Sequence, residues 1–444
     1  MSHADSIRFI VQPGGSLKGR IRVPGDKSIS HRSIMLGSLA EGTTEVSGFL
    51  QGEDCLCTLN AFRAMGVSIE GPTADGRVVI HGVGLHGLRA PVHDLDMGNS
   101  GTSMRLMAGL MSGQAFDVRM NGDGSLSKRP MKRVTVPLAD MGARIETTAA
   151  GTPPLMVRGG STLHGMHYDM PVASAQVKSA LLLAGLYAEG ETSVTEPAPT
   201  RDHTERMLRG FGYPVQTDGR RISLKGGGRL GAMAIDVPSD ISSAAFFMVG
   251  ASIAPGSELV IEHVGMNPTR TGVIEILRLM GADLEIQNPR EVGGEPVADI
   301  RVRAARLKGI RIPEALVPLA IDEFPVLFVA AACADGETVL TGAEELRVKE
   351  SDRIQVMVDG LAACGIDARP TPDGIVIQGG PLSGATVTSH NDHRIAMAFS
   401  IAGLRAAVPM TIDDCATVNT SFPGFVALAA GAGLAIREQR TVQG

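Results

Sequence analysis

The chain is built on a phrase that recurs six times. An apolar helical stretch, a small turn and a β-branched strand are followed by an amphipathic helix, a glycine and a further strand. The glycines that end the second helix of each copy are separated by 76, 70, 69, 84 and 68 residues; they are Gly66, Gly142, Gly212, Gly281, Gly365 and Gly433. Glycine at this place fits a helix C-cap, where the chain turns left-handed before a strand. We therefore expect an α/β fold of six similar units.

The arrangement of the six units is open at this level. They fit either one ring or two groups of three, and the repeat pattern alone does not decide between them. The segment 226–239 (GGGRLGAMAIDVPS) lies between the third and fourth copies and is a candidate crossover.

Composition excludes several classes of function. Aromatic residues make up 3% of the 444-residue chain and the net charge is −6, so neither stacking platforms nor a basic footprint for nucleic acid is expected. The five cysteines form no CxxC pair, which argues against a disulfide framework or a zinc site and suits a reducing cytosol. The N-terminal sequence has no apolar run fit for a signal peptide, and the apolar stretch 324–334 is too short to span a bilayer. We predict a cytoplasmic protein without a membrane partner.

Cations stand at six of the expected helix starts. They are Lys27, Arg32, Lys128, Arg129, Arg201, Arg270, Arg347, Lys349, Arg353, His393 and Arg394. The first turn of a helix presents free N–H groups and a positive dipole end, so cations are unfavourable there unless an anion lies among them. For a single arginine at a helix start, taken alone, a solvated salt bridge is the better explanation. Six such starts in one repeat array favour a shared phosphate or carboxylate ligand.

Small polar and acidic residues accompany the cations. Gly101 would let a ligand approach the backbone, whereas Ser174 and its neighbours could simply be N-caps. Asp322-Glu323 precedes an apolar helix, and Glu350 stands between Lys349 and Arg353. Each carboxylate is a bridge partner, a helix-start residue favoured by the dipole, or a general acid or base.

Nine short motifs stand in order along the chain: PGDKSISHR (24–32), GNSGTSMR (98–105), KRPM (128–131), SAQVKSALLLAG (174–185), TRDHTE (200–205), IDEFP (321–325), LRVKESDR (346–353), NDHRIAM (391–397) and SFP (421–423). In these motifs the chain resembles the 5-enolpyruvylshikimate-3-phosphate synthase family. The ordered set covers nearly the whole chain. The resemblance implies a two-domain inside-out α/β barrel of six βαβαββ repeats, three in each domain. It places residues 1–20 and 238–444 in domain I and residues 21–237 in domain II.

The resemblance also implies a reaction. Two domains close over shikimate 3-phosphate and phosphoenolpyruvate, and the enolpyruvyl group moves to the shikimate 5-hydroxyl with release of phosphate. The reaction is an addition and elimination through a tetrahedral intermediate, which needs an acid and a base. No metal and no organic cofactor is implied.

The implied site residues follow from the matching motifs. Asp322 takes the proton from the 5-hydroxyl, and Glu350 with Lys27 handles the proton at the methylene carbon. Shikimate 3-phosphate is bound by Lys27, Ser28, Arg32, Ser174, Ala175, Gln176, Arg201, Asp322 and Lys349. Phosphoenolpyruvate is bound by Lys27, Gly101, Arg129, Gln176, Arg353 and Arg394, the last two clamping its carboxylate in a forked geometry.

Two positions bear on how the site would differ within the family. Asn419-Thr420 stand where many members have a Lys before the [TS]FP motif, so Arg129 is expected to carry more of the contact with the phosphoenolpyruvate phosphate. Gly101 is Ala in glyphosate-tolerant members, and we therefore predict sensitivity to glyphosate.

Two other functions were weighed. The related transferase acting on UDP-N-acetylglucosamine typically has a reactive Cys in the loop at 121–127, and this chain has none there. A non-catalytic anion-binding protein would not need Asp322 and Glu350 together with Lys27. A hinged enzyme with its site in its own cleft needs no partner subunit, so we expect a monomer.

Overall fold

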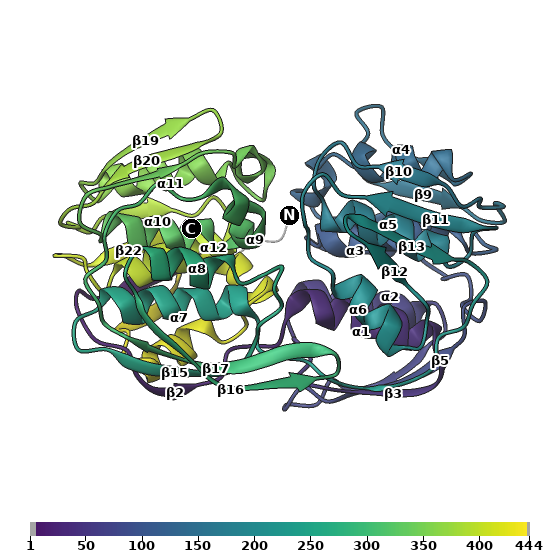
Figure 1. Ribbon diagram of the computed structural model, residues 1–444, viewed down its shortest axis with the longest axis horizontal. Helices are drawn as coiled ribbons and strands as arrows, with labels where there is room; N and C mark the ends of the chain where they lie inside the picture. Colours follow the sequence, from purple (N-terminus) through teal and green to yellow (C-terminus); the bar gives the residue numbers. More distant parts are fainter. Residues whose placement is uncertain (1–5, 442–444) are drawn as a thin grey trace. The chain divides into compact units, whose positions relative to one another are not determined.

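The computed structural model describes residues 6–441 and divides the chain into two compact units (Figure 1). Unit 2 consists of residues 25–237 together with Val292–Glu295, and unit 1 of the other described residues. The second boundary falls inside the candidate crossover 226–239. The domain limits 1–20, 21–237 and 238–444 stay a prediction.

Unit 2 alternates helices with short strands. Its helices are α1 (Lys27–Leu39), α2 (Glu53–Ala64), α3 (Gly101–Ser112), α4 (Lys132–Asp140), α5 (Ala175–Gly185), α6 (His203–Gly210) and the 3-10 turn η1 (Leu126–Lys128). Its strands are β3 (Glu41–Ser47), β4 (Ser68–Glu70), β5 (Val78–Val83), β6 (Leu95–Asp96), β7 (Val118–Asn121), β8 (Arg144–Glu146), β9 (Leu155–Arg158), β10 (His167–Asp169), β11 (Glu191–Thr195), β12 (Gln216–Asp218), β13 (Arg221–Lys225) and β14 (Ala234–Asp236).

The strands of unit 2 form three four-stranded sheets with one topology. Their orders are β14-β3-β5-β4, β6-β7-β9-β8 and β10-β11-β13-β12. In each sheet the first pair of strands is parallel and the next two pairs are antiparallel. Strand β14, the last of the unit, pairs with β3 from the first copy, with Ile235 opposite Val46. The repeated sequence phrase thus becomes a repeated sheet.

Unit 1 is assembled from both ends of the chain. Its helices are α7 (Ile241–Ile253), α8 (Gly272–Leu279), α9 (Val317–Ala320), α10 (Phe324–Ala332), α11 (Arg353–Ala363), α12 (His393–Ala402) and α13 (Phe425–Ala432), with 3-10 turns η2 (Glu314–Leu316), η3 (Ile321–Glu323), η4 (Glu344–Val348) and η5 (Cys415–Thr420). Its strands are β1 (Ser6–Val11), β2 (Lys18–Ile21), β15 (Glu258–Gly265), β16 (Asp283–Val292), β17 (Glu295–Arg303), β18 (Glu337–Leu340), β19 (Asp367–Thr371), β20 (Gly374–Gln378), β21 (Thr386–Thr388), β22 (Met410–Asp413) and β23 (Ile436–Thr441).

The first two strands complete sheets made by the second half of the chain. The sheet orders in unit 1 are β16-β17-β15-β2, β18-β20-β19 and β21-β22-β1-β23. Strand β1 lies between β22 and β23, antiparallel to both, and β2 runs parallel to β15. Since β1 and β2 pair with strands beyond residue 237, these two strands belong to unit 1. The fold is mixed α/β.

All six glycines of the sequence repeat adopt the left-handed conformation. Their φ angles lie between 80° for Gly212 and 120° for Gly433. Five of them follow the C-cap of their helix, and Gly433 is itself the C-cap residue of α13. The C-cap prediction is confirmed, because only glycine takes such a φ without a Cβ penalty.

Each unit has its own hydrophobic core. One cluster of buried side chains includes Phe247, Phe324 and Phe399 in unit 1, and a separate one includes Phe62 and Leu181 in unit 2. Helix α7 is buried along its whole length, as expected for a helix that is apolar on every face. In unit 2, Gly109 allows α3 to approach α5 closely, since a Cβ there would lie 2.1 Å from the carbonyl oxygen of Ala180.

One helical run is longer than its sequence suggested. The turns η2 and η3 join α9 and α10 into a run of 19 residues, Glu314–Ala332, long and apolar enough to cross a membrane by length and composition. The prediction that this apolar stretch is too short to span a bilayer is therefore wrong on length. However, 67% of its apolar window is buried inside the protein. That burial is typical of the core helix of a globular fold.

Candidate active site

In unit 1 the Asp322 carboxylate is surrounded by three cationic side chains. Its Oδ1 lies 3.6 Å from Lys349 Nζ and 3.4 Å from Arg353 Nη1, and its Oδ2 lies 4.0 Å from Arg394 Nη2. Asp322 occupies η3, immediately before α10, whose early proline fixes the start of that helix. A carboxylate in contact with cations that can also bind an anionic ligand is a candidate general base.

Arg353 is the most deeply buried cation of this group. Its side chain is 1% exposed and donates from Nε to Asp392 Oδ2 at 2.9 Å and from Nη2 to Glu350 Oε2 at 2.7 Å. Burial alone would lower the pKa of Arg353, but the carboxylates of Asp392, Glu350 and Asp322 outweigh it and raise that pKa. Arg353 is therefore a permanent cation that is already bonded to protein carboxylates.

Helix α11 starts later than expected. The sequence predicts that this helix opens at Arg347, and that prediction is wrong. Arg347 lies in η4, and α11 begins at Arg353 after the N-cap Asp352, which accepts from Gln355 N at 3.0 Å. Arg347 pairs with Asp352 at 2.7 Å, so for this residue the salt-bridge alternative is confirmed.

Arg394 is held more loosely than Arg353. It is the second residue of α12, and its backbone N–H donates to the N-cap Asp392 at 3.0 Å. Among residues 6–441 its guanidinium makes a single ion pair, the 4.0 Å contact with Asp322. Of the two arginines expected to clamp one substrate carboxylate, Arg394 is the one whose charge is less engaged within unit 1.

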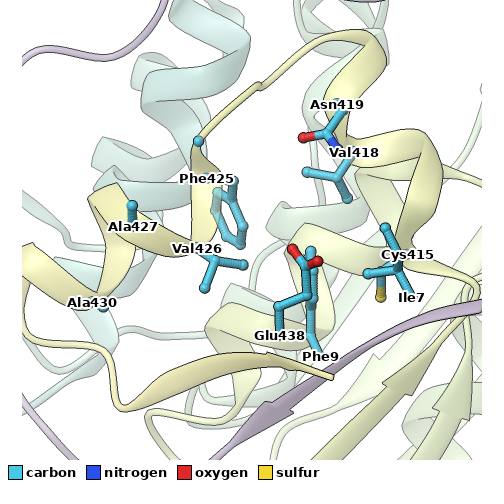
Figure 2. A pocket seen from close by; sticks show the side chains of 11 residues that line it. Ile7, Phe9, Cys415, Val418, Asn419, Phe425, Val426, Ala427, Ala430 and Glu438 are labelled. Atoms are coloured by element: carbon cyan, nitrogen blue, oxygen red, sulfur yellow. The ribbon is translucent and has the colours of Figure 1, made fainter. Parts of the chain in front are cut away.

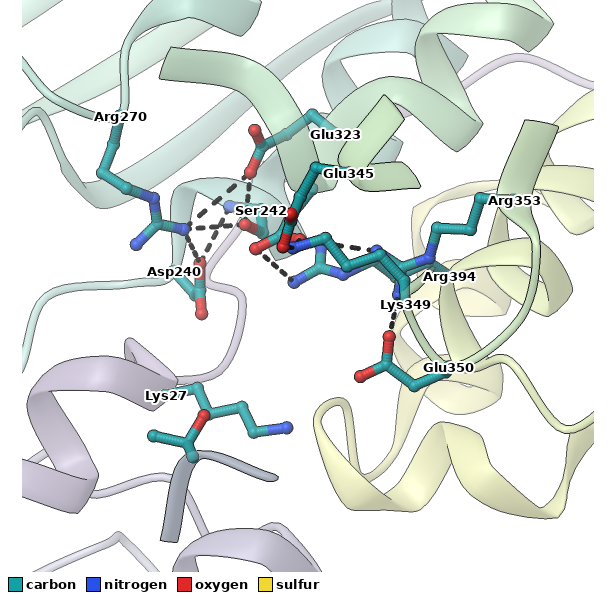
Figure 3. Close-up of polar contacts among 12 residues, drawn as sticks. Lys27, Asp240, Ser242, Arg270, Glu323, Glu345, Lys349, Glu350, Arg353 and Arg394 are labelled. Carbon is teal, nitrogen blue, oxygen red and sulfur yellow. Dashed lines mark hydrogen bonds and ion pairs between the residues drawn. The ribbon is translucent and has the colours of Figure 1, made fainter. Parts of the chain in front are cut away.

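A second buried cluster adjoins Asp322 through the chain. Arg270 Nη2 lies 3.1 Å from Asp240 Oδ1, 2.7 Å from Ser242 Oγ and 3.9 Å from Glu323, and the Ser242 hydroxyl bonds Glu323 (Figure 3). Asp240 is also the N-cap of α7. The sequence singled out Arg270 as a cation at a helix start. In the structure Arg270 is buried and pairs with Asp240 and with Glu323, the residue next to Asp322.

In unit 2, Lys27 is the first residue of α1. The N-cap Asp26 accepts from Ile29 N at 2.8 Å, and the Lys27 ammonium pairs with Asp54 of α2. The Lys27 side chain is 20% exposed, so it remains in contact with solvent. Lys27 and Ser28 therefore stand together on the first turn of α1.

Arg32 lies one turn further along α1 and is bound by neutral groups. Its Nε donates to Thr204 Oγ1 at 2.6 Å, its Nη2 to Ser179 Oγ at 2.9 Å and its Nη1 to the Ser28 carbonyl oxygen at 2.9 Å. Burial lowers the pKa of Arg32 to about 10, an effect that Glu205 partly offsets and nearby Arg201 increases. Arg32 is still a cation at neutral pH.

The start of α3 brings Gly101 close to two arginines. A Cβ on Gly101 would lie 2.8 Å from Arg105 Nη1 and 3.2 Å from Arg129 Nη1. Arg129 donates to Asn99 Oδ1 at 2.8 Å, and Arg105 donates to Gln176 Oε1 at 2.9 Å. Backbone N–H groups, two guanidinium groups and an amide thus meet at one helix N-terminus, which is an arrangement for binding a phosphate.

Ser174 is the N-cap of α5, accepting from Val177 N at 3.3 Å, so the capping alternative is confirmed for this residue. Ala175 and Gln176 form the first turn of that helix. Arg201 lies just before α6, whose N-cap is Asp202.

Asn419 is not grouped with these residues. It lines an apolar cavity of about 340 Å³ with Phe9, Val418, Phe425 and Glu438 (Figure 2). None of the sequence-predicted site residues lines that cavity.

The geometry therefore yields one set of groups in each unit. Unit 1 assembles Asp322, Lys349, Glu350, Arg353 and Arg394, and unit 2 assembles Lys27, Ser28, Arg32, Gly101, Arg129, Ser174, Ala175, Gln176 and Arg201. Comparison with known proteins identifies the family to which this chain belongs. The model of the family described as EPSP synthase (3-phosphoshikimate 1-carboxyvinyltransferase) matches residues 11–428.

The chain belongs to the EPSP synthase family.

Curated relatives match over almost the full length. A protein of Methylococcus capsulatus named 3-phosphoshikimate 1-carboxyvinyltransferase is 71% identical over 434 residues, which cover 98% of this chain and 99% of the relative. One of the same name from Alkalilimnicola ehrlichii is 70% identical, covering 97% and 96%. A solved structure of EPSP synthase from Acinetobacter baumannii has a TM-score of 0.89 at 63% identity, covering 98% of this chain and all of that one.

Sequence reasoning missed several polar residues inside the family motifs. Arg105 lies in the GNSGTSMR motif, four residues after Gly101 on the same helix face, and this spacing could have indicated it. Asp392 stands directly before α12, where an acidic N-cap is expected. Ser179 and Thr204 carried no local signal, because they reach Arg32 from 147 and 172 residues away.

Proposed function

We propose that this chain transfers the enolpyruvyl group of phosphoenolpyruvate to the 5-hydroxyl of shikimate 3-phosphate and releases phosphate. The name shared by its full-length relatives supports the reaction. The observation that carries it to particular residues is the Asp322 carboxylate, within 4.0 Å of the cations of Lys349, Arg353 and Arg394. A base among anion-binding groups is what deprotonation of a hydroxyl on a phosphorylated acid requires.

Asp322 and Glu350 of unit 1 carry the acid–base chemistry in this proposal together with Lys27 of unit 2. Asp322 accepts the proton of the 5-hydroxyl as its oxygen adds to C2 of phosphoenolpyruvate, while Glu350 together with Lys27 supplies a proton to C3. The addition gives a tetrahedral intermediate in which C3 is a methyl group. This methyl group then loses a proton while phosphate leaves C2. Lys349 binds the acceptor, and Arg353 and Arg394 take the phosphoenolpyruvate carboxylate.

The carboxylates already bonded to Arg353 add a condition to this role. Glu350 lies 2.7 Å from Arg353 Nη2, on the edge of the guanidinium that a substrate carboxylate would use. The substrate carboxylate thus contacts Arg394 first. Glu350 then moves away from Arg353, and Arg353 binds the same carboxylate. The same movement makes Glu350 available for proton transfer.

The residues of unit 2 bind anions in this proposal. Lys27, Ser28 and Arg32 take the carboxylate side of shikimate 3-phosphate, and Ser174, Ala175, Gln176 and Arg201 take its phosphate and ring. Gly101, Arg129 and Gln176 serve the phosphoenolpyruvate phosphate. Arg105, which touches Gln176, joins that second group.

The finer expectations of the family resemblance belong to the same proposal. We infer that the two units are three-repeat halves of an inside-out α/β barrel, which the recurring sheet order supports. We further propose a cytoplasmic monomer that is inhibited by glyphosate, with no nucleic-acid or membrane partner and no metal or cofactor requirement.

The test is phosphate release by the purified protein in EDTA. Phosphoenolpyruvate is supplied with shikimate 3-phosphate or with UDP-N-acetylglucosamine as acceptor. Release with shikimate 3-phosphate alone supports the proposal, and Asp322→Asn is then expected to lose about a hundredfold or more in kcat. Release with the sugar nucleotide alone overturns the choice of acceptor. Binding of shikimate 3-phosphate without turnover supports a non-catalytic anion-binding protein.

A further inference from the structure

Two family motifs contain buried polar residues that the proposed reaction does not use. Lys178 lies in SAQVKSALLLAG, and Thr204 and Glu205 lie in TRDHTE. All three are buried, and Lys178 is 0% exposed in the middle of α5. Removing a charge from water is costly unless it is paired, so these groups need a structural or functional reason.

Lys178 is the centre of a buried ion triad in unit 2. Its Nζ lies 2.6 Å from Glu205 Oε1 and 2.8 Å from Glu196 Oε1. Thr200 donates a further hydrogen bond to Glu196. One ammonium is thus shared by two carboxylates, both of them buried.

Arg32 lies close to this triad but pairs with none of its carboxylates. Nε and Nη2 form one edge of a guanidinium, and on Arg32 this edge faces the hydroxyls of Thr204 and Ser179, which are 2.7 Å from each other. In a forked pair, a carboxylate would place its two oxygens there. Among residues 6–441, Arg32 has no ion pair with a carboxylate, so its charge is not cancelled by direct contact.

Glu205 is the natural competitor for Arg32. It follows Thr204 directly in the chain, and its charge is the largest influence that favours the charged form of Arg32 against the effect of burial. What holds Glu205 elsewhere is its 2.6 Å contact with Lys178.

We propose that Lys178 holds Glu205 away from Arg32, so that this guanidinium keeps its charge for a substrate carboxylate. Thr204 and Ser179 orient it through neutral hydrogen bonds. The inference rests on the proposed function, since it takes the ligand of Arg32 to be the carboxylate of shikimate 3-phosphate. Lys178, Thr204 and Ser179 are positioning residues, because they act through Arg32.

Substitutions at Thr204 test the orienting hydroxyl. Thr204→Val keeps the shape but removes the acceptor of Arg32 Nε, so the KM for shikimate 3-phosphate rises about ten-fold or more. The KM for phosphoenolpyruvate stays within about two-fold of the wild type and Thr204→Ser restores the lost affinity. The matched control is Thr192→Val in β11, a buried threonine whose hydroxyl has no hydrogen-bond partner within the described part of the chain. An unchanged KM in Thr204→Val, or equal effects on both KM values without rescue by serine, overturns the proposal.

Substitutions at Lys178 test the charge argument. Lys178→Met releases Glu205 toward Arg32, and the KM for shikimate 3-phosphate rises about ten-fold or more. Lys178→Met/Glu205→Gln removes the competing charge and recovers most of that loss. A double variant no better than the single one, with both folded by circular dichroism, contradicts the charge argument. If Lys178→Met does not fold, the comparison of Thr204→Val with Thr204→Ser still tests whether Arg32 is positioned by its neighbours.

A separate measurement distinguishes failure of this inference from failure of the proposed function. Turnover of shikimate 3-phosphate by the wild type is measured first, and its absence counts against the proposed function alone. Calorimetric binding of shikimate 3-phosphate to the wild type and to Thr204→Val needs no turnover. Equal affinities there overturn the positioning role whatever the reaction is.

Discussion

Two buried arginines, one in each unit, are held in opposite ways. Arg353 of unit 1 is bonded to Asp392 and Glu350 and lies 3.4 Å from Asp322, and these carboxylates raise its pKa despite burial. Arg32 of unit 2 is bonded to two hydroxyls and a backbone carbonyl oxygen, and burial lowers its pKa to about 10.

The difference separates stability from readiness to bind. A guanidinium surrounded by carboxylates attracts an incoming anion only after one of them moves away, as proposed for Glu350, and its loss leaves those carboxylates uncompensated. A guanidinium held by hydroxyls keeps its charge, while the hydroxyls can bond each other without it. Unit 1 therefore depends on its arginine for folding more than unit 2 does.

The largest expected effect is on the stability of unit 1. Arg353→Met leaves Asp392, Glu350 and Asp322 without their shared cation, so the free energy of unfolding falls by about 3–5 kcal/mol. Urea unfolding monitored by circular dichroism measures it. Arg347→Met is the matched control, because its pair with Asp352 is partly exposed and is worth about 1 kcal/mol or less. Equal losses in the two variants would remove one side of the comparison.

The corresponding change in unit 2 is expected to cost less stability. In Arg32→Met the Thr204 and Ser179 hydroxyls remain bonded to each other at 2.7 Å, so the unfolding free energy falls by about 1–2 kcal/mol. Binding of shikimate 3-phosphate is lost in the same variant, and calorimetry on the folded protein detects this. A loss of stability as large as that of Arg353→Met would show that the two arginines do not differ as argued.

This contrast separates what could be predicted from the sequence from what could not. The left-handed glycines, such as Gly66 and Gly433, were predictable because helix C-cap chemistry is local. Lys27 and Arg394 lie in the first turn of a helix as predicted, whereas Arg347 does not. Whether a cation meets hydroxyls or carboxylates depends on residues 39 positions away for Arg353 and 172 for Arg32, and no local rule supplies those.

The start of α11 shows the limit on a smaller scale. The run from Arg347 to Arg353 mixes cations with the acidic residues Glu350 and Asp352, so its charges alone could not separate η4 from α11. The side chain of Asp352 decides the point by capping Gln355, which requires a non-helical backbone at Asp352. Ser351, directly before Asp352, is by residue type an equally good N-cap candidate.

The third prediction concerns the response of unit 2 to acid. His31 is buried in α1, with its Nδ1 2.8 Å from Thr58 Oγ1, and burial followed by the charges of Lys27 and Arg32 holds its pKa well below 6.5. The unfolded chain takes up a proton at His31 below about pH 6.5 whereas the folded unit does not, so stability falls as the pH drops. The contribution of this residue is at most about 1.4 kcal/mol per pH unit.

A variant isolates that contribution. His31→Asn keeps a polar group near Thr58 and removes the titration, so the difference in urea midpoint between wild type and variant narrows from pH 7 to pH 5. The control variant is His81→Asn. His81 is exposed and pairs with Glu70, so its substitution does not report on a buried histidine. A constant difference for His31→Asn across this range contradicts a neutral buried histidine.

The smallest expected change in stability is at Gly101, beside Arg105 and Arg129, which we propose bind a phosphate. In Gly101→Ala the new Cβ lies 2.8 Å from Arg105 Nη1 and 3.2 Å from Arg129 Nη1, which are flexible side-chain ends that can shift by a few tenths of an ångström. Unfolding free energy therefore changes by less than about 0.5 kcal/mol. The shift narrows the space before α3, so inhibition by glyphosate, the longer ligand, weakens more than the KM for phosphoenolpyruvate rises. Gly124→Ala is the matched control, since a Cβ there meets nothing within 4 Å, and both constants stay at their wild-type values. If Gly101→Ala instead lowers stability as much as Arg32→Met does, then Arg105 and Arg129 are fixed parts of the fold, and unit 2 holds only Arg32 in readiness for an anion.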